Sequence, residues 1–262
     1  MTPPTRDLDD AYANMVHIPD GASYPEKWAK QAEAFRATVP VERNLRYGAG
    51  EREVFDLFRP EGTAAGLVVF VHGGYWLKFS KDDWSHLAAG ALARGWAVAI
   101  PSYTLAPDAR ITDIGRQIES AIGAAAALVD GPIRICGHSA GGHLTARMLC
   151  DDYASDWRPR LERAIPISPI SDLGPLMRTS MNDKLQITRT EAALESPVRH
   201  MPCGLPTTIW VGGSERPVFL DQARWLADAW GCGLVIEDGR HHFDVVEALA
   251  DPESLLTREL LL

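Results

Sequence analysis

The sequence predicts an α/β fold in which a mostly parallel, doubly wound sheet is flanked by helices. Short apolar runs alternate along the chain with longer amphipathic segments, and such alternation favours parallel strands joined by right-handed crossovers. A length of 262 residues suits one domain with a large core. Hydrophobic residues make up 46% and charged residues 23%, which is ordinary for a globular protein. We therefore expect residues 1–262 to form a single domain.

The individual elements follow from the periodicity of apolar residues. Helical spacing predicts helices at 24–38, 82–94 and 111–129. An alternating pattern predicts a strand at 54–58, and short apolar runs predict strands at 67–71, 96–100, 133–136, 164–168, 207–211 and 233–237. Further helices are expected after the strand at 133–136 and after each of the last two strands. Ser80 and Asp83 predict a capping box before the second helix. Residues 171–200 interrupt the alternation, so we expect at most a small cap there and a rather open site.

The most informative motif is Gly-His-Ser-Ala-Gly at residues 137–141. It follows the apolar run 133–136 and precedes a helix-compatible segment at 142–149. This strand, sharp turn and helix form the context in which Gly-x-Ser-x-Gly exposes a nucleophilic serine at the top of a sheet. The glycines allow a tight turn without Cβ clashes. The motif predicts that Ser139 is a catalytic nucleophile.

A glycine-rich loop follows the strand expected at 67–71. In acyl-transfer enzymes such a loop turns backbone N–H groups toward the developing oxyanion, and the residue after the nucleophile supplies another N–H. We assign the loop donors mainly to Gly74 and Tyr75, with Gly73 shaping the turn, and the last donor to Ala140.

The serine needs a base and an orienting acid, which follow it along the chain in the order acid, then histidine. Glu215 lies just past the strand expected at 207–211 and is the favoured acid, with Asp238 and Asp244 as rivals. Two adjacent histidines follow the strand at 233–237. We favour His242 over His241, because His242 directly precedes the Phe-Asp pair at the start of the next helix.

These motifs together resemble the kynurenine formamidase (arylformamidase) branch of the α/β-hydrolases, close to the hormone-sensitive-lipase-like esterases. His-Gly-Gly-Tyr-Trp at 72–76 is similar to the His-Gly-Gly-x-Trp signature of this branch. The resemblance spans about residues 8 to 250, and other similar segments are 12–14, 44–48, 103–107, 213–219 and 242–247. Glu215 stands where the family usually has Asp, and a longer carboxylate can serve the same role.

The resemblance implies a serine hydrolase that works through an acyl-enzyme on aryl formamides such as N-formylkynurenine. A carboxylesterase or thioesterase for short acyl groups is the alternative, and a non-catalytic ligand-binding protein on the same fold is a third hypothesis. The candidate substrate contacts are Tyr75, Trp76, Phe79 and Met181. Lys78 and Arg110 are further candidates for meeting a substrate carboxylate.

The net charge and the cysteine content limit the kinds of molecule that the protein is expected to bind. A net charge of −9 argues against nucleic acid and anionic membranes. The start of the chain, residues 1–7, lacks the apolar region of a signal peptide, which predicts a cytoplasmic protein. The four cysteines match no metal-site spacing, and a metal at His241 and His242 is the weaker interpretation. We expect a small-molecule ester or formamide substrate, no metal and no cofactor; oligomeric state is not predicted.

Overall fold

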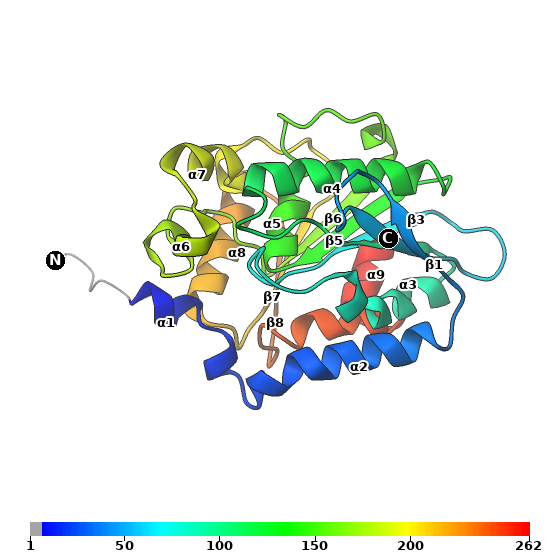
Figure 1. The fold of residues 1–262 in the computed structure, drawn as a ribbon, viewed down its shortest axis with the longest axis horizontal. Helices are drawn as coiled ribbons and strands as arrows, with labels where there is room; N and C mark the ends of the chain where they lie inside the picture. Colours follow the sequence, from blue (N-terminus) through cyan, green and yellow to red (C-terminus); the bar gives the residue numbers. More distant parts are fainter. Residues whose placement is uncertain (1–6) are drawn as a thin grey trace.

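The computed structural model describes residues 7–262, so the first six residues of the polar amino terminus lie outside the described range. Within that range, eight strands form one sheet in the order β1-β2-β4-β3-β5-β6-β7-β8 (Figure 1). The strands are β1 Val41–Arg46, β2 Val54–Phe58, β3 Leu67–Val71, β4 Ala97–Pro101, β5 Ile133–His138, β6 Leu161–Ile167, β7 Thr208–Gly212 and β8 Gly233–Glu237.

The sheet is mostly parallel, which confirms the predicted fold class. Every neighbouring pair from β4 through β8 is parallel, whereas β2 pairs antiparallel with both β1 and β4. Strand β1 is not predicted from the sequence pattern. This strand lies at the edge of the sheet, most of its side chains are exposed, and its sequence VERNLR contains no apolar run.

Helices cover both faces of the sheet (Figure 1). Alternate strand residues point to opposite faces. Val69 and Ile135 belong to the core cluster beneath α4, α5 and α8, whereas Val68 and Phe70 pack with α2, α3 and α9. The helices are α1 Leu8–Tyr12, α2 Tyr24–Arg36, α3 Ala89–Ala93, α4 Ile111–Ala126, α5 Ala140–Arg147, α6 Asn182–Leu185, α7 Arg189–Glu195, α8 Pro217–Trp230 and α9 Leu255–Leu261.

The helix expected at 82–94 is mostly wrong. The segment forms 3₁₀ turns at Lys81–Asp83 and Ser85–Ala88, and only α3 is α-helical. Trp84, with φ −126° and ψ 5°, interrupts the helix because its buried ring packs against the rings of Trp28 and Phe79. The predicted capping box of Ser80 and Asp83 is present, although it caps a 3₁₀ turn.

Two other regions affect the site. The segment 171–200 contains α6, α7 and two 3₁₀ turns, all short. After the loop that carries His242, the expected helix is a 3₁₀ segment, Val245–Ala250. None of the helices in residues 7–262 combines the length and apolarity that a bilayer crossing requires.

Candidate active site

Ser139 occupies a sharp turn between β5 and α5. Its backbone has φ 58° and ψ −116°, a conformation that L-residues other than glycine rarely adopt. The backbone N–H of Ser139 donates to the carbonyl of Ile167 at 2.8 Å, which ties the turn to the neighbouring strand β6. The serine side chain is buried among protein atoms but lines the main pocket.

The glycines of the motif are required by close packing. A Cβ on Gly137 would lie 2.4 Å from the carbonyl oxygen of Gly141, and a Cβ on Gly141 would lie 2.0 Å from that of Val71. Real Cβ atoms do not approach carbonyl oxygens so closely. The start of α5 therefore packs directly against the end of β3, and this contact sets the position of Ser139 beside the glycine-rich loop.

The glycine-rich loop lies next to Ser139. A Cβ on Gly73 would be 3.1 Å from the Cβ of Ser139. Within residues 7–262, the backbone N–H groups of Gly74 and Tyr75 have no hydrogen-bond acceptor. The N–H of Ala140 begins α5, where helix geometry also leaves it without an intrahelical acceptor. Donors without partners beside a nucleophile are what an oxyanion site needs.

Glu215 and His242 form a buried pair. Nδ1 of His242 lies 2.5 Å from Oε2 of Glu215. A carboxylate only accepts, so Nδ1 carries the proton and Nε2 is left as the basic nitrogen. The other carboxylate oxygen, Oε1, accepts from the N–H of Gly212 at 2.9 Å and from the hydroxyl of Ser168 at 2.5 Å. No sequence motif indicates this role for Ser168, although it ends an expected strand.

The rival residues have other partners. Nε2 of His241 lies 3.2 Å from the hydroxyl of Tyr24, and its Nδ1 accepts from the backbone N–H groups of residues 243 and 244. Asp244 accepts from the backbone N–H of His241 at 2.7 Å. Asp238 is exposed. None of these three side chains contacts Glu215 or His242 through a hydrogen bond.

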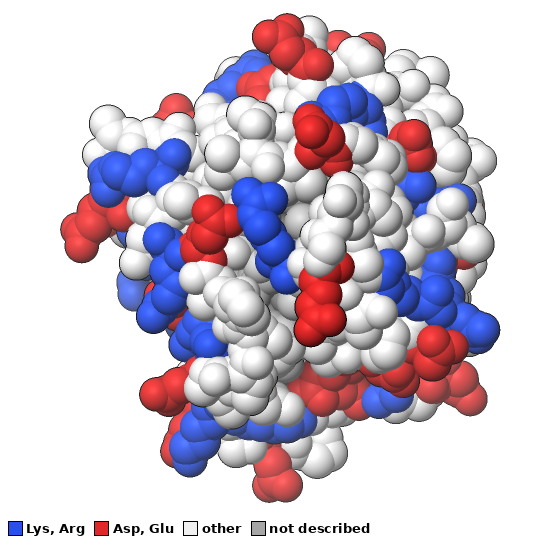
Figure 2. All heavy atoms as spheres, turned by 90° about the vertical axis from the view of Figure 1, so that its right-hand side faces the viewer, with Lys and Arg blue, Asp and Glu red and all other residues white. Residues whose placement is uncertain are grey.

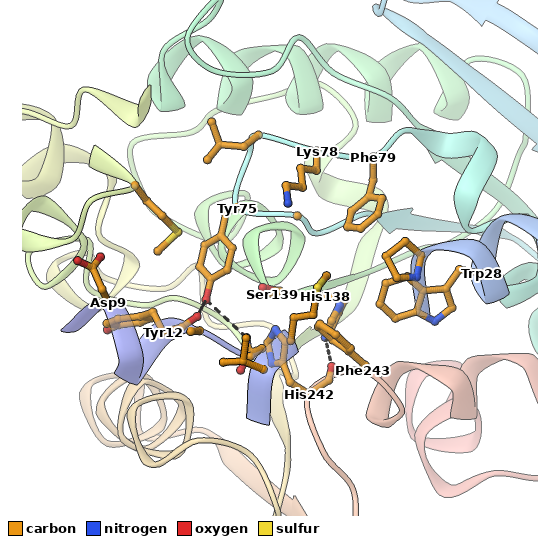
Figure 3. Close-up of a pocket in the computed structure, with 18 of the residues that line it drawn as sticks. Asp9, Tyr12, Trp28, Tyr75, Lys78, Phe79, His138, Ser139, His242 and Phe243 are labelled. Atoms are coloured by element: carbon orange, nitrogen blue, oxygen red, sulfur yellow. Dashed lines mark hydrogen bonds between the residues drawn. The ribbon is translucent and has the colours of Figure 1, made fainter. Parts of the chain in front are cut away.

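Ser139 and His242 line the same pocket, but their side chains form no hydrogen bond within the described part of the chain (Figure 3). In structures without substrate such bonds are often long and close only when substrate binds. The structure therefore brings the serine and the histidine to one cavity without joining them directly.

The pocket is a largely apolar cavity of about 400 Å³. This volume lies within the range of small-molecule sites. Tyr75, Phe79 and Met181 line it, as expected from the sequence. Its other aromatic walls are Tyr12, Trp28, Trp84 and Phe243.

Trp76 is a correction to the predicted substrate contacts. Its side chain is completely buried and does not line the pocket. Tyr75 and Trp76 have φ values of 54° and 58°, and the indole packs edge-on against the ring of His143, with 5.0 Å between centroids. The indole therefore belongs to the core.

The amino-terminal segment forms a wall of the pocket that sequence reasoning did not find. Residues 12–16 line the cavity together with Asp9. The hydroxyl of Tyr75 donates to the carbonyl of Tyr12 at 2.7 Å (Figure 3), and Asp9 accepts from the backbone N–H and hydroxyl of Ser180. These bonds join the segment to the glycine-rich loop and to the region 171–200. The family resemblance at residues 12–14 was the one sequence feature that pointed to this segment, and it did not indicate a role in the pocket.

Lys78 and Arg110 differ in their surroundings. Arg110 forms an ion pair with Glu191 and lies outside the pocket lining. Lys78 lines the pocket, and its side chain points into the cavity from the same loop as Tyr75 and Phe79 (Figure 3). Among residues 7–262, Lys78 has no ion-pair partner. It is a cation available to a bound molecule.

Three side chains outside the pocket bring potential metal ligands within 4.8 Å of one another: Cys150, Asp152 and His200. The guanidinium of Arg147 donates to both carboxylate oxygens of Asp152, at 3.1 and 2.7 Å. This fixed positive charge beside the carboxylate opposes a cation, so we assign no metal to the group.

Charges of both signs are mixed on the surface shown in Figure 2. Lys and Arg side chains alternate there with Asp and Glu, and no single sign dominates this face. The face therefore offers no continuous basic surface of the kind that binds nucleic acid.

The parallel sheet, its flanking helices and the strand–turn–helix at Ser139 define an α/β-hydrolase. Esterase B from Lactobacillus rhamnosis shares this fold, at 16% identity and a TM-score of 0.67 over 91% of both chains. The family model described as BD-FAE matches residues 55–155. A kynurenine formamidase from Danio rerio is 30% identical over 247 residues, covering 87% of this chain and 84% of that protein.

The chain thus belongs to the kynurenine formamidase family and is an esterase-like or arylformamidase-like hydrolase. The crystal structure of a candidate thioesterase from Silicibacter sp. TM1040 is also similar. It is 53% identical, has a TM-score of 0.96, and covers 98% of this chain and 99% of that chain.

Proposed function

We propose that this protein hydrolyses aryl formamides that carry a carboxylate, such as N-formylkynurenine, with a triad of Ser139, His242 and Glu215. The observation that carries the proposal is the pocket. Aromatic walls lead to Ser139, and the ammonium group of Lys78, which has no ion-pair partner among residues 7–262, enters the same cavity. An aryl ring fits the walls, and a carboxylate on the substrate fits the ammonium group.

The proposed reaction assigns a role to each residue of the triad and to the backbone N–H groups beside Ser139. Nε2 of His242 takes the hydroxyl proton of Ser139 while the oxygen attacks the formyl carbon. Backbone N–H groups of Gly74, Tyr75 and Ala140, with Gly73 shaping the loop, bind the oxyanion, and Glu215 stabilises the imidazolium. The imidazolium then protonates the arylamine nitrogen as the C–N bond breaks. Water, deprotonated by His242, releases formate from the formyl-enzyme.

In this proposal residues 7–262 act as one domain, and the segment 171–200 is a small cap. Ser180 and Met181 line the pocket from this segment, and Asp9 binds Ser180 from the amino-terminal side. The cap and the amino-terminal segment together close part of the cavity above Ser139. We place the enzyme in the cytoplasm, with small molecules as its partners.

Hydrolysis of short acyl thioesters is the second candidate, because the candidate thioesterase from Silicibacter sp. TM1040 is 53% identical. A direct comparison of substrates separates the two. We expect kcat/KM for N-formylkynurenine to exceed that for p-nitrophenyl acetate and for acetyl-coenzyme A, measured by absorbance under the same conditions. A preference for the thioester would replace the first proposal by the second.

The contribution of Lys78 is tested with Lys78→Met, which keeps the length of the side chain but removes its charge. We expect KM for N-formylkynurenine to rise about fivefold, the upper value for an exposed ion pair, with kcat unchanged. Turnover of p-nitrophenyl acetate, which has no carboxylate, is the control and should not change. An equal effect on both substrates would show that Lys78 does not bind the carboxylate.

A further inference from the structure

His138 is a buried histidine inside the nucleophile motif, and the proposed reaction does not use it. It is the last residue of β5, directly before Ser139, and its side chain is 3% exposed. Its Nε2 lies 2.7 Å from the backbone carbonyl oxygen of His242 (Figure 3). A carbonyl oxygen only accepts, so Nε2 of His138 carries the proton and donates it.

The ring of His138 also contacts the imidazole of His242. The ring centroids are 4.6 Å apart at an interplanar angle of 43°. Phe219 packs on the same imidazole, with its centroid at 4.2 Å. The imidazole of His242 is therefore packed against the rings of His138 and Phe219 and bonded to Glu215 at Nδ1. The backbone carbonyl of His242 is bonded to His138.

The bond from His138 connects the nucleophile motif to the loop that carries His242. Within the described residues, it is the one hydrogen bond between the motif at 137–141 and His242. Two backbone bonds hold the histidine loop on either side of His242. The N–H of Ser214 donates to the carbonyl of Arg240, and the N–H of Val245 donates to the carbonyl of His241. Because His138 and Ser139 are consecutive, the bond relates the base directly to the nucleophile.

We propose that His138 is a positioning residue, which holds the imidazole of His242 at the distance and angle from which Nε2 reaches the hydroxyl of Ser139. The inference rests on the proposed triad. Its physical basis is that reacting groups must be aligned before reaction, and a misplacement of about 1 Å can cost about 100-fold in rate.

The charge state of His138 is consistent with this role. Its Nδ1 is buried and has no hydrogen-bond partner among the described residues. Burial, followed by the nearby His242, lowers the pKa of His138 well below its usual value. His138 therefore stays neutral, and it places no like charge beside the imidazolium that forms on His242 during the reaction.

The test compares two substitutions of His138 with a matched control. His138→Leu removes the donor, whereas His138→Gln keeps an N–H donor at a similar distance from the backbone. His143→Leu is the control, because Nε2 of His143 makes the same kind of buried bond, 2.6 Å long, to the carbonyl of Glu195. That carbonyl lies in α7 and not in the histidine loop.

Two readouts separate positioning from general stability. The first is kcat and KM for p-nitrophenyl acetate, which needs only a working serine and base. The second is the low-field proton resonance of the His242 Nδ1–H, which requires no substrate. For His138→Leu we expect kcat to fall about 100-fold with KM within about threefold, and the resonance to broaden or shift. His138→Gln should recover kcat to within about fivefold. His143→Leu should lower Tm but leave both readouts unchanged.

The inference is overturned if His138→Leu keeps kcat within about threefold, or if His143→Leu reduces kcat equally. If the leucine variant does not fold, His138→Gln and His138→Asn decide, because the shorter amide of asparagine cannot reach the carbonyl and should lose activity. If the wild-type enzyme hydrolyses p-nitrophenyl acetate but not N-formylkynurenine, only the proposed substrate is refuted. A wild-type enzyme that turns over no ester and resists a fluorophosphonate probe at Ser139 would refute the triad and this inference together.

Discussion

Ser139 combines a strained backbone conformation with a position on the wall of the pocket. Its backbone conformation, with φ 58°, is unfavourable for serine. It persists because Gly137 and Gly141 allow β3, β5 and α5 to pack closely around the turn. Ser139 thereby lines the pocket beside Gly74 and Tyr75, whose backbone N–H groups have no hydrogen-bond acceptor within residues 7–262. Strain at this residue is maintained by packing and is placed where the proposed chemistry occurs.

Ser139→Ala should abolish turnover and leave the fold intact, because the change removes one oxygen from a packed turn. Nucleophilic serines of this kind contribute about 10⁶-fold in rate. The measurement is kcat on any accepted substrate, with Tm as the control for folding. A variant that keeps a tenth of wild-type turnover would exclude Ser139 as the nucleophile.

Glu215→Gln should reduce kcat roughly 10³- to 10⁴-fold. Glutamine keeps the size, but its amide no longer selects the imidazole tautomer in which Nδ1 carries the proton. Glu215→Asp should retain more activity, because it keeps the charge, although its shorter side chain must still reach Nδ1 of His242. Steady-state kinetics of the two variants, with Asp244→Asn as the matched control, test this assignment. The hypothesis fails if Asp244→Asn is the more damaging change.

At the scale of elements, the site depends on where loops leave the sheet. The loops after β3, β5, β7 and β8 carry, in turn, the proposed oxyanion donors, the proposed nucleophile, the proposed acid and the proposed base. These strands are parallel, so their carboxyl ends meet at one edge. The sheet therefore converts four distant sequence segments into one cavity.

Gly141→Ala should destabilise the protein by about 3 kcal/mol, the upper range for overpacking a tight contact. The added methyl group would lie 2.0 Å from the carbonyl oxygen of Val71, so α5 must move away from β3. Gly123→Ala in α4 is the control, since its Cβ would be 3.3 Å from Trp157 and alanine favours a helix. Urea denaturation measures both. Equal stability of the two variants would refute the packing account.

At the scale of the whole molecule, several histidines are buried in their neutral form. Burial lowers the pKa of His72 and of His143 to about 3, and that of His86 to about 4. Their ordinary pKa, which applies to the unfolded chain, is about 6.5. Between these values the unfolded chain binds more protons than the folded protein, so stability must rise with pH in this window.

The free energy of unfolding should therefore be highest above pH 6.5 and should fall as the pH decreases from 6.5 to 4. Each such histidine contributes at most about 1.4 kcal/mol per pH unit. Urea denaturation at several pH values measures the slope. His86→Leu should make it shallower by about that amount, because both ring nitrogens of His86 lack partners among residues 7–262 and the change breaks no hydrogen bond. A free energy of unfolding that does not change between pH 4 and 6.5, or that has the same pH slope in His86→Leu as in the wild type, would contradict this account.

Local sequence signals were sufficient for most of the fold. The buried strands are short apolar runs, so β3, β4, β5 and β7 could be predicted to within a few residues. The edge strand β1 could not, because an exposed strand needs no apolar pattern. The helix expected at 82–94 was wrong for a related reason: the ring of Trp84 packs against distant aromatic residues, and that contact overrides local helix propensity.

The sequence by itself determined those parts of the site that are formed by residues adjacent in the chain. The tight turn at 137–141 and the glycine-rich loop are specified by adjacent residues, because only glycine tolerates such close backbone approach. Tertiary structure decided which distant groups meet. The bond of His242 to Glu215, the pocket wall from residues 12–16, the burial of Trp76 and the link from His138 to the histidine loop all join segments far apart in the chain. Such contacts depend on packing in three dimensions, which no local pattern encodes.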